Sequence, residues 1–382
     1  MIDRVAVAHV LEHVRVAWSR RTVGKAKHAR PTNDASRAKF ALAALGFLVG
    51  ALAADRLEAQ APIAQAPAAT PLPRQPPGAK PAETKPPAWP PASGPPVRAG
   101  REPDLAYGAY QRGYFLTAFG EATRRVNEKQ DPRAMTLLGE LYANGLGVPL
   151  DEVKAAKWYQ LAADRGDRDA MFALAIFHIS RRGGLHDRAE AARLLASAAK
   201  LGHAAAAYDL GLLYLEGQQF PQDFARAAEL FKAAAQQGNA EAQYALATLY
   251  KDGKGVEKNP AEAGRLLAAA ALAETLDAEV EYAIALFNGA GVAKDEAKAA
   301  ALFRKAALRG SPIAQNRLAR LLSVGRGATP NPTEAVKWHL IAKAGGDGDP
   351  YLDQFAAEQT PQVRAAAEKA ARPWLAVLQP KS

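Results

Sequence analysis

The chain has 382 residues and a net charge of +10, and nearly half of its residues are hydrophobic. This composition supplies enough apolar side chains for a sizeable core, and the length allows two or three segments. The chain contains no cysteine, which excludes a disulfide framework, a thiolate zinc site and a cysteine nucleophile.

The excess positive charge lies near the amino terminus. Residues 1–54 carry a net charge of +6, residues 55–103 carry +2, and residues 104–382 carry only +2. Proteins that bind nucleic acid usually concentrate Lys and Arg on their folded surface. The charge distribution therefore argues against a nucleic-acid partner.

The segment 40–54 reads FALAALGFLVGALAA and is uncharged, whereas the tail 1–39 is basic. A membrane span usually needs about 20 apolar residues, so this run better suits the hydrophobic region of a secretory signal. The long basic tail leaves two interpretations open: a cleaved signal with an over-extended start, or a signal-anchor that holds the chain in an inner membrane. Both predict a periplasmic or other extracytoplasmic location. A cytoplasmic protein in which this segment is a buried helix is the alternative.

Residues 55–103 are rich in proline and alanine, with four Pro-Pro pairs. Proline lacks the amide donor and fixes φ, so such a segment does not build helix or sheet. We predict a disordered, extended linker here.

Alanine recurs at intervals of 36 residues beyond the linker, without an insertion. The first register comprises Ala134, Ala170, Ala206, Ala242, Ala278 and Ala314. Alanine recurs again 21 and 28 residues after each of these positions. Self-similarity at this period predicts a solenoid of six stacked units, each burying its apolar face on its neighbours.

Each repeat encodes two helices. With the register alanine as position zero, small or apolar residues at positions zero, four, seven and eight form one stripe of a first helix. A Gly-x-Gly that ends this helix follows in four copies. Glutamates three residues after the N-cap of the second helix predict capping boxes at Glu190, Glu262 and Glu334. Position 17 carries a helix N-cap residue in every copy: Asp151, Asp187, Asp223, Asn259, Asp295 and Asn331.

Residues 350–382 follow the last repeat. Their pattern predicts one amphipathic capping helix, with Ala366, Ala370 and Leu375 on its apolar face, and a short tail. A terminal helix of this kind covers the end of a repeat stack.

The series Gly139-x-x-Tyr142-x-x-Gly145-x-Gly147, followed by Lys154-Ala155-x-x-Trp158-Tyr159, resembles the Sel1-like repeat (SLR), a relative of the tetratricopeptide repeat. The resemblance covers about residues 104–349, with a shorter tetratricopeptide-type unit first. It implies an all-α fold, a right-handed α-solenoid of helix-turn-helix repeats. It also implies that the chain is a non-enzymatic scaffold or adaptor that binds a helix or extended peptide of another protein in the concave groove of the solenoid.

The residues themselves offer no independent catalytic or metal-binding set. His178 and His339 occupy aromatic core positions of the repeat, and His203 has no acidic or serine partner at a useful spacing. Glu279 and Glu281 fit a solvated helix face. We therefore predict no cofactor and no metal. An envelope enzyme or glycan-binding protein that uses the same groove is the alternative, and a convergent acid pair with a raised pKa would favour it.

Positions two, six and nine of the first helix form a face separate from the packing stripe. Apolar and aromatic residues on this face predict a groove for a partner. The alternative is that these residues contact the adjacent first helix. The candidates in the second, third and fourth repeats are Phe172, Ile176 and Ile179, Tyr208, Leu212 and Leu215, and Tyr244, Thr248 and Lys251.

Overall fold

The computed structural model describes residues 104–217 and 220–378. The predicted basic tail 1–39, signal segment 40–54 and linker 55–103 lie outside the described residues. Within the described ranges the chain forms sixteen α-helices, one short 3-10 helix and no strand, which confirms the all-α class.

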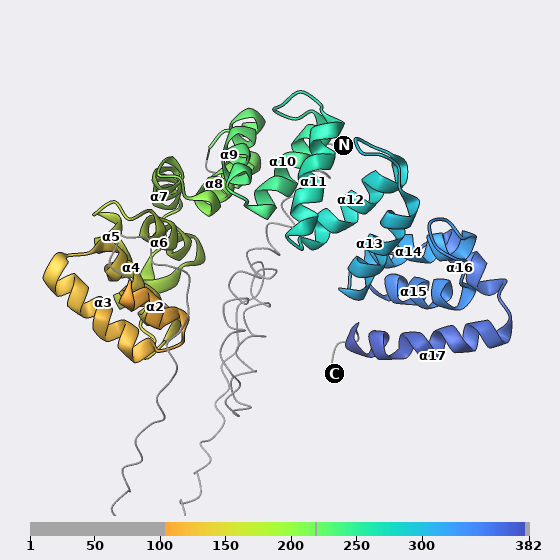
Figure 1. Cartoon of the computed structure of the whole chain (residues 1–382), viewed down its shortest axis with the longest axis horizontal. Helices are drawn as coiled ribbons and strands as arrows, with labels where there is room; N and C mark the ends of the chain where they lie inside the picture. Colours follow the sequence, from red (N-terminus) through yellow and green to blue (C-terminus); the bar gives the residue numbers. More distant parts are fainter. Residues whose placement is uncertain (1–103, 218–219, 379–382) are drawn as a thin grey trace, which may run out of the picture. The chain divides into compact units, whose positions relative to one another are not determined.

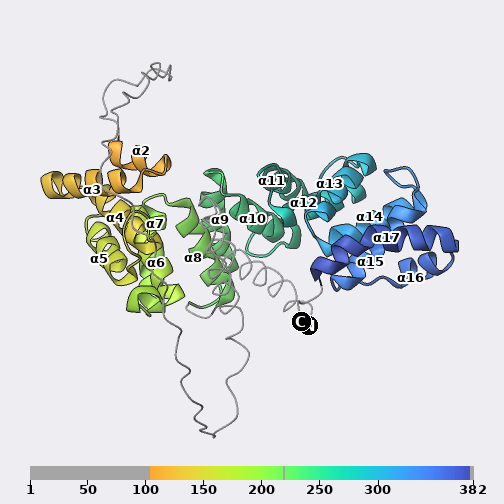
Figure 2. The ribbon, with the colours of Figure 1, turned by 90° about the horizontal axis from the view of Figure 1, so that it is seen from below.

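The helices follow one another along the chain as packed pairs (Figures 1 and 2). The pair before the repeats is α2 (Leu105–Gln111) and α3 (Phe115–Lys129). Up to α15, every helix packs against the next one in chain order, and α17 packs back on α15. The first helices of the six repeats are α4 (Pro132–Asn144), α6 (Arg168–Ser180), α8 (Ala204–Glu216), α10 (Ala240–Asp252), α12 (Leu276–Asn288) and α14 (Pro312–Val324). The second helices are α5 (Glu152–Ala163), α7 (Arg188–Lys200), α9 (Phe224–Gln236), α11 (Pro260–Leu272), α13 (Glu296–Leu308) and α15 (Pro332–Ala344).

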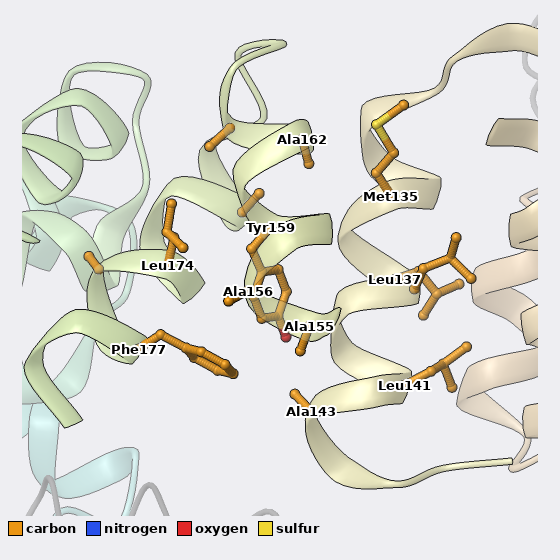
Figure 3. Packing of buried hydrophobic residues seen from close by; sticks show 14 of the residues in the cluster. Met135, Leu137, Leu141, Ala143, Ala155, Ala156, Tyr159, Ala162, Leu174 and Phe177 are labelled. Carbon is orange, nitrogen blue, oxygen red and sulfur yellow. The ribbon is translucent and has the colours of Figure 1, made fainter. Parts of the chain in front are cut away.

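The recurring alanines are buried where the helices cross. The alanine at position 28 of every repeat, from Ala162 to Ala342, has no exposed surface. Small side chains let helix backbones approach closely, and larger residues fill the space between the contacts. Tyr159 illustrates this on α5, where it lies among alanines and meets the ring of Phe177 edge to face at 5.3 Å (Figure 3).

The six predicted N-caps of the second helices all form. In each repeat the cap side chain accepts a hydrogen bond from the amide three residues later, as Asp223 does from Arg226 at 2.8 Å. The cap residue's own amide donates to the position-eight carbonyl in five repeats, for example from Asp151 to Tyr142 at 3.0 Å. In the second repeat it donates instead to Nδ1 of His178.

The hydrogen bond donated by the cap residue's own amide explains why the predicted capping boxes are wrong. A capping box needs the amide of the cap residue as its donor, and that amide is already engaged. The glutamates pair with arginines instead: Glu190 with Arg193, Glu262 with Arg265, and Glu334 with Arg304.

The loop glycines serve two different purposes. The first ends the helix in the left-handed conformation, as Gly289 does at φ 70°. The second lies against the preceding repeat, because a Cβ at Gly291 would sit 1.9 Å from the Pro260 carbonyl oxygen. In the second repeat Arg181 adopts the left-handed conformation, and Gly183 makes the close contact with the Glu152 backbone.

The carboxyl-terminal region differs from its prediction. It forms two helices, α16 (Pro350–Ala357) and α17 (Pro361–Leu378), instead of one. The buried alanines of α17 are Ala367 and Ala371, whereas the predicted Ala366 and Ala370 are exposed. Leu375 does pack against the core, as expected.

Removal of one N-cap tests this account of the repeat. Asp223→Ala leaves the first amides of α9 without an acceptor and should lower the free energy of unfolding by about 1 kcal/mol. Asp223→Asn, which keeps a capping oxygen, should retain most of the stability. Lys232→Ala on the exposed side of α9 should change it by less than about 0.5 kcal/mol. Urea unfolding of the full chain measures all three, and equal losses for Asp223→Ala and Lys232→Ala would contradict the capping role.

Candidate protein-binding surface

The predicted binding residues of the second and fourth repeats lie partly exposed on α6 and α10. Phe172 stacks on the imidazole of His203 at 4.4 Å between ring centroids. Ile176 and Ile179 are half-buried. On α10, Tyr244 and Thr248 are half-buried, and Lys251 is exposed. Binding by these six residues stays a prediction.

Two contacts on α10 limit what its residues offer a partner. The Lys251 ammonium lies 3.0 Å from the Glu281 carboxylate, so its charge is already paired. Burial, followed by the charges of Glu281 and Asp277, raises the pKa of the Tyr244 hydroxyl well above its usual value. This hydroxyl therefore stays protonated at physiological pH.

The predicted residues of the third repeat belong to the core and are not a binding surface. Tyr208, Leu212 and Leu215 retain only 6%, 2% and 4% exposure and cluster with side chains of the neighbouring helices. The Phe231 ring also packs closely against α8, because Gly211 has no Cβ. For this repeat, the packing interpretation of the face is correct.

The same helix positions are open in the fifth and sixth repeats, where they line a pocket of about 440 Å³. We call this cavity, which is lined by residues of α12, α13, α14 and α16 and of the loop after α14, the C-terminal pocket. Ile284 and Phe287 occupy positions six and nine of α12, and Arg320 occupies position six of α14. Leu321 and Val324 extend the apolar lining. The pocket thus lies at the predicted helix positions, but in repeats for which no binding residue was predicted.

Arg320 is fixed in the C-terminal pocket by a buried acid. Both carboxylate oxygens of Asp349 accept hydrogen bonds from its guanidinium, which also lies 5.2 Å from the centre of the Tyr351 ring. Asp349 is 4% exposed and caps α16 by accepting from the Tyr351 amide. Burial opposes ionisation of Asp349, but Arg320 and the helix amides outweigh it and hold the carboxyl pKa below its usual value.

Arg326 forms a second fixed side of the pocket. Its guanidinium lies 4.5 Å from the centre of the Phe287 ring and pairs with Glu296. Hydrogen bonds from Arg326 and Lys294 lower the pKa of the Glu296 carboxyl to about 2. The pair is therefore ionised throughout the physiological pH range.

Arg317 differs from both. Among the described residues it forms no hydrogen bond or ion pair, although its charge favours ionisation of Asp347. Burial of Asp347 nevertheless raises the pKa of that carboxyl. Arg317 thus presents guanidinium donors that remain available to a ligand.

His203 and His339 have structural roles. His203 caps α8 by accepting from the Ala206 amide at 3.0 Å, and buried His339 lies 2.8 Å from the Asp353 carboxylate. Within residues 104–217 and 220–378, no group of three or more His, Asp or Glu side chains is arranged to hold a metal ion. In the same part of the chain, every helix is too short or too polar to cross a membrane.

The fold and surface define a stack of helix pairs with an open pocket near its carboxyl-terminal end. The model of the Sel1 repeat matches six successive stretches, residues 132–167, 168–203, 204–239, 240–274, 276–311 and 312–347. Together they make up more than half of the chain. The chain therefore belongs to the Sel1 repeat family, whose proteins are generally protein-interaction scaffolds and typically not enzymes.

Two solved structures share this architecture. A Sel1 repeat protein from Oxalobacter formigenes is 25% identical, with a TM-score of 0.55, over 62% of this chain and 94% of that one. The protective antigen c5321 of uropathogenic Escherichia coli, which displays an SLR fold, is 24% identical, with a TM-score of 0.51, over 71% of this chain and 67% of its own. The second likeness concerns the fold alone. No curated protein matches the chain.

The contrast between repeats can be tested at one helix position. Leu212→Ala removes a core side chain and should lower the free energy of unfolding by about 2–5 kcal/mol. Thr248→Ala, at the same position in the next repeat, should cost less than about 1 kcal/mol, since that side chain is partly exposed. Chemical denaturation of both variants makes the comparison. Similar small losses of stability in the two variants would show that Leu212 is a surface residue.

Proposed function

We propose that this protein is an exported scaffold that holds a partner protein on the first-helix face of its repeat stack. The observation that carries the proposal is the C-terminal pocket, where Ile284, Phe287 and Arg320 lie at helix positions outside the repeated packing stripe. Protein-interaction surfaces typically combine such apolar anchors with arginine. The general role of the Sel1 repeat family supports the same conclusion.

The extracytoplasmic location rests on the sequence of residues 1–103. The uncharged segment 40–54 after a basic tail supports export, and the proline-rich linker would separate the repeats from a signal or membrane anchor. On this proposal the partner is another protein of the cell envelope.

Site-specific photo-crosslinking in cells tests the scaffold role. A photoreactive amino acid replaces Val324, which lines the pocket and is 54% exposed, or Lys232 on the outer side of α9 as the control. We expect a discrete higher-mass protein adduct from position 324, absent from position 232 and identifiable by mass spectrometry. Equal labelling at both positions, or no protein adduct at 324, would contradict partner binding at this face.

The location has its own test. Residues 1–103 fused to a reporter that is active only outside the cytoplasm should give activity, because segment 40–54 directs export. Leu48→Arg places a charge in the apolar run, which costs about 2.5–3.5 kcal/mol on insertion scales, and should abolish the activity. Leu57→Arg, outside the run, is the matched control. A fusion active only in a cytoplasmic assay would favour the cytoplasmic alternative.

A further inference from the structure

The C-terminal pocket has a defined charge. Its only charged lining residues are Arg317, Arg320 and Arg326. Asp349 and Glu296 pair with the last two, so two of the three positive charges are compensated within the protein. Of the three, only Arg317 forms no ion pair with a described residue, so the pocket suits a ligand group with a single negative charge better than a polyanion.

The apolar part of the pocket is held in place by these ion pairs. Arg326 covers one side of the Phe287 ring, and Arg320 lies against Tyr351, whose hydroxyl is 3.3 Å from Oγ of Ser323. Ile284 and Leu321 come from the rigid helices α12 and α14. A site fixed in this way loses little conformational freedom when an apolar group enters it.

The size of the pocket limits the distance between the apolar group and the carboxylate of a ligand. A pocket of 440 Å³ is roughly 8 Å across. An extended peptide advances about 3.3 Å per residue, so about two residues span it. An apolar side chain in the cavity and a carboxylate on Arg317 thus belong to neighbouring or next-but-one residues of one peptide.

We propose that the C-terminal pocket recognises an extended peptide segment in which an aromatic or branched apolar residue lies within two positions of an aspartate or glutamate. The apolar side chain enters between Phe287, Ile284 and Leu321. The carboxylate accepts charge-assisted hydrogen bonds from Arg317. The proposal rests on the proposed scaffold function and names the chemistry of the partner.

A peptide selection tests this chemistry. A phage-displayed library of random twelve-residue peptides is selected on the immobilised full chain, on Arg317→Glu and on Lys232→Glu. Lys232→Glu makes the same charge change on α9 and serves as the control. Wild type and the control should both enrich an acidic residue within two positions of an apolar one. Arg317→Glu should lose the acidic preference and enrich Lys or Arg at that place.

Affinity measurements complete the test. A synthetic peptide from the wild-type pool should bind at least tenfold more weakly to Arg317→Gln, whose side chain is uncharged, and also when its own acid is replaced by the corresponding amide. Circular dichroism and urea unfolding check that the variants remain folded, as expected for an exposed side chain without an ion pair.

Three results would overturn the inference: a pool without acidic enrichment, an acidic preference unchanged in Arg317→Glu, or a self-association of the chain that Arg317→Glu dissolves. The last result would make a second copy of the chain the occupant. If either of the first two results is obtained while position 324 still gives a protein adduct, the scaffold function stands and only the peptide chemistry is refuted. Loss of that adduct refutes the scaffold function itself.

Discussion

The fold depends on a backbone contact between successive repeats. The second loop glycine of one repeat lies against the amino-terminal turn of the preceding repeat's second helix, where a Cβ would come within 1.9 Å of the Pro260 carbonyl at Gly291 and 2.1 Å of the Glu296 carbonyl at Gly327. No side chain fits between them, so the backbones themselves fix the distance between these neighbours. The repeats keep a spacing of 36 residues without an insertion for the same reason: each loop must place its second glycine against the preceding repeat. This regularity brings equivalent positions of the first helices onto one face.

Features that depend on residues within one repeat could be predicted from the sequence. The helix pairs, the buried alanines and the N-caps at position 17 follow from periodicity and capping chemistry. The predicted capping boxes do not form, because the amide of the cap residue donates to a residue nine positions earlier in the chain. The Asp151 amide, for example, donates to the Tyr142 carbonyl. The prediction of the buried face of the carboxyl-terminal helix was wrong for another reason. Alanines at 365–367 and 370–371 differ too little from one another to define which ones face the core.

The site could be predicted only in part, because exposure depends on neighbouring repeats. Positions six and nine of the first helix do line a pocket in the fifth repeat, where Ile284 and Phe287 remain open, but Leu212 and Leu215 at the same positions of the third repeat are covered by the core. Apolar residues occupy both sets of positions, so the sequence of a single repeat does not distinguish these cases. The surroundings of a charged side chain depend on neighbouring helices in the same way. Glu279, predicted to be solvated, is fully buried and pairs with Lys305 and Arg309.

A regular stack presents similar surfaces many times, so a surface that differs from the others arises where the regularity is broken. The end of the stack is such a place. Asp349 caps α16, which follows the last repeat, and the same carboxylate fixes Arg320 of α14. Tyr351, from the same turn of α16, contributes to the wall of the pocket. The terminal helices therefore do more than cover the last apolar face: through Asp349 and Tyr351 they also shape the C-terminal pocket.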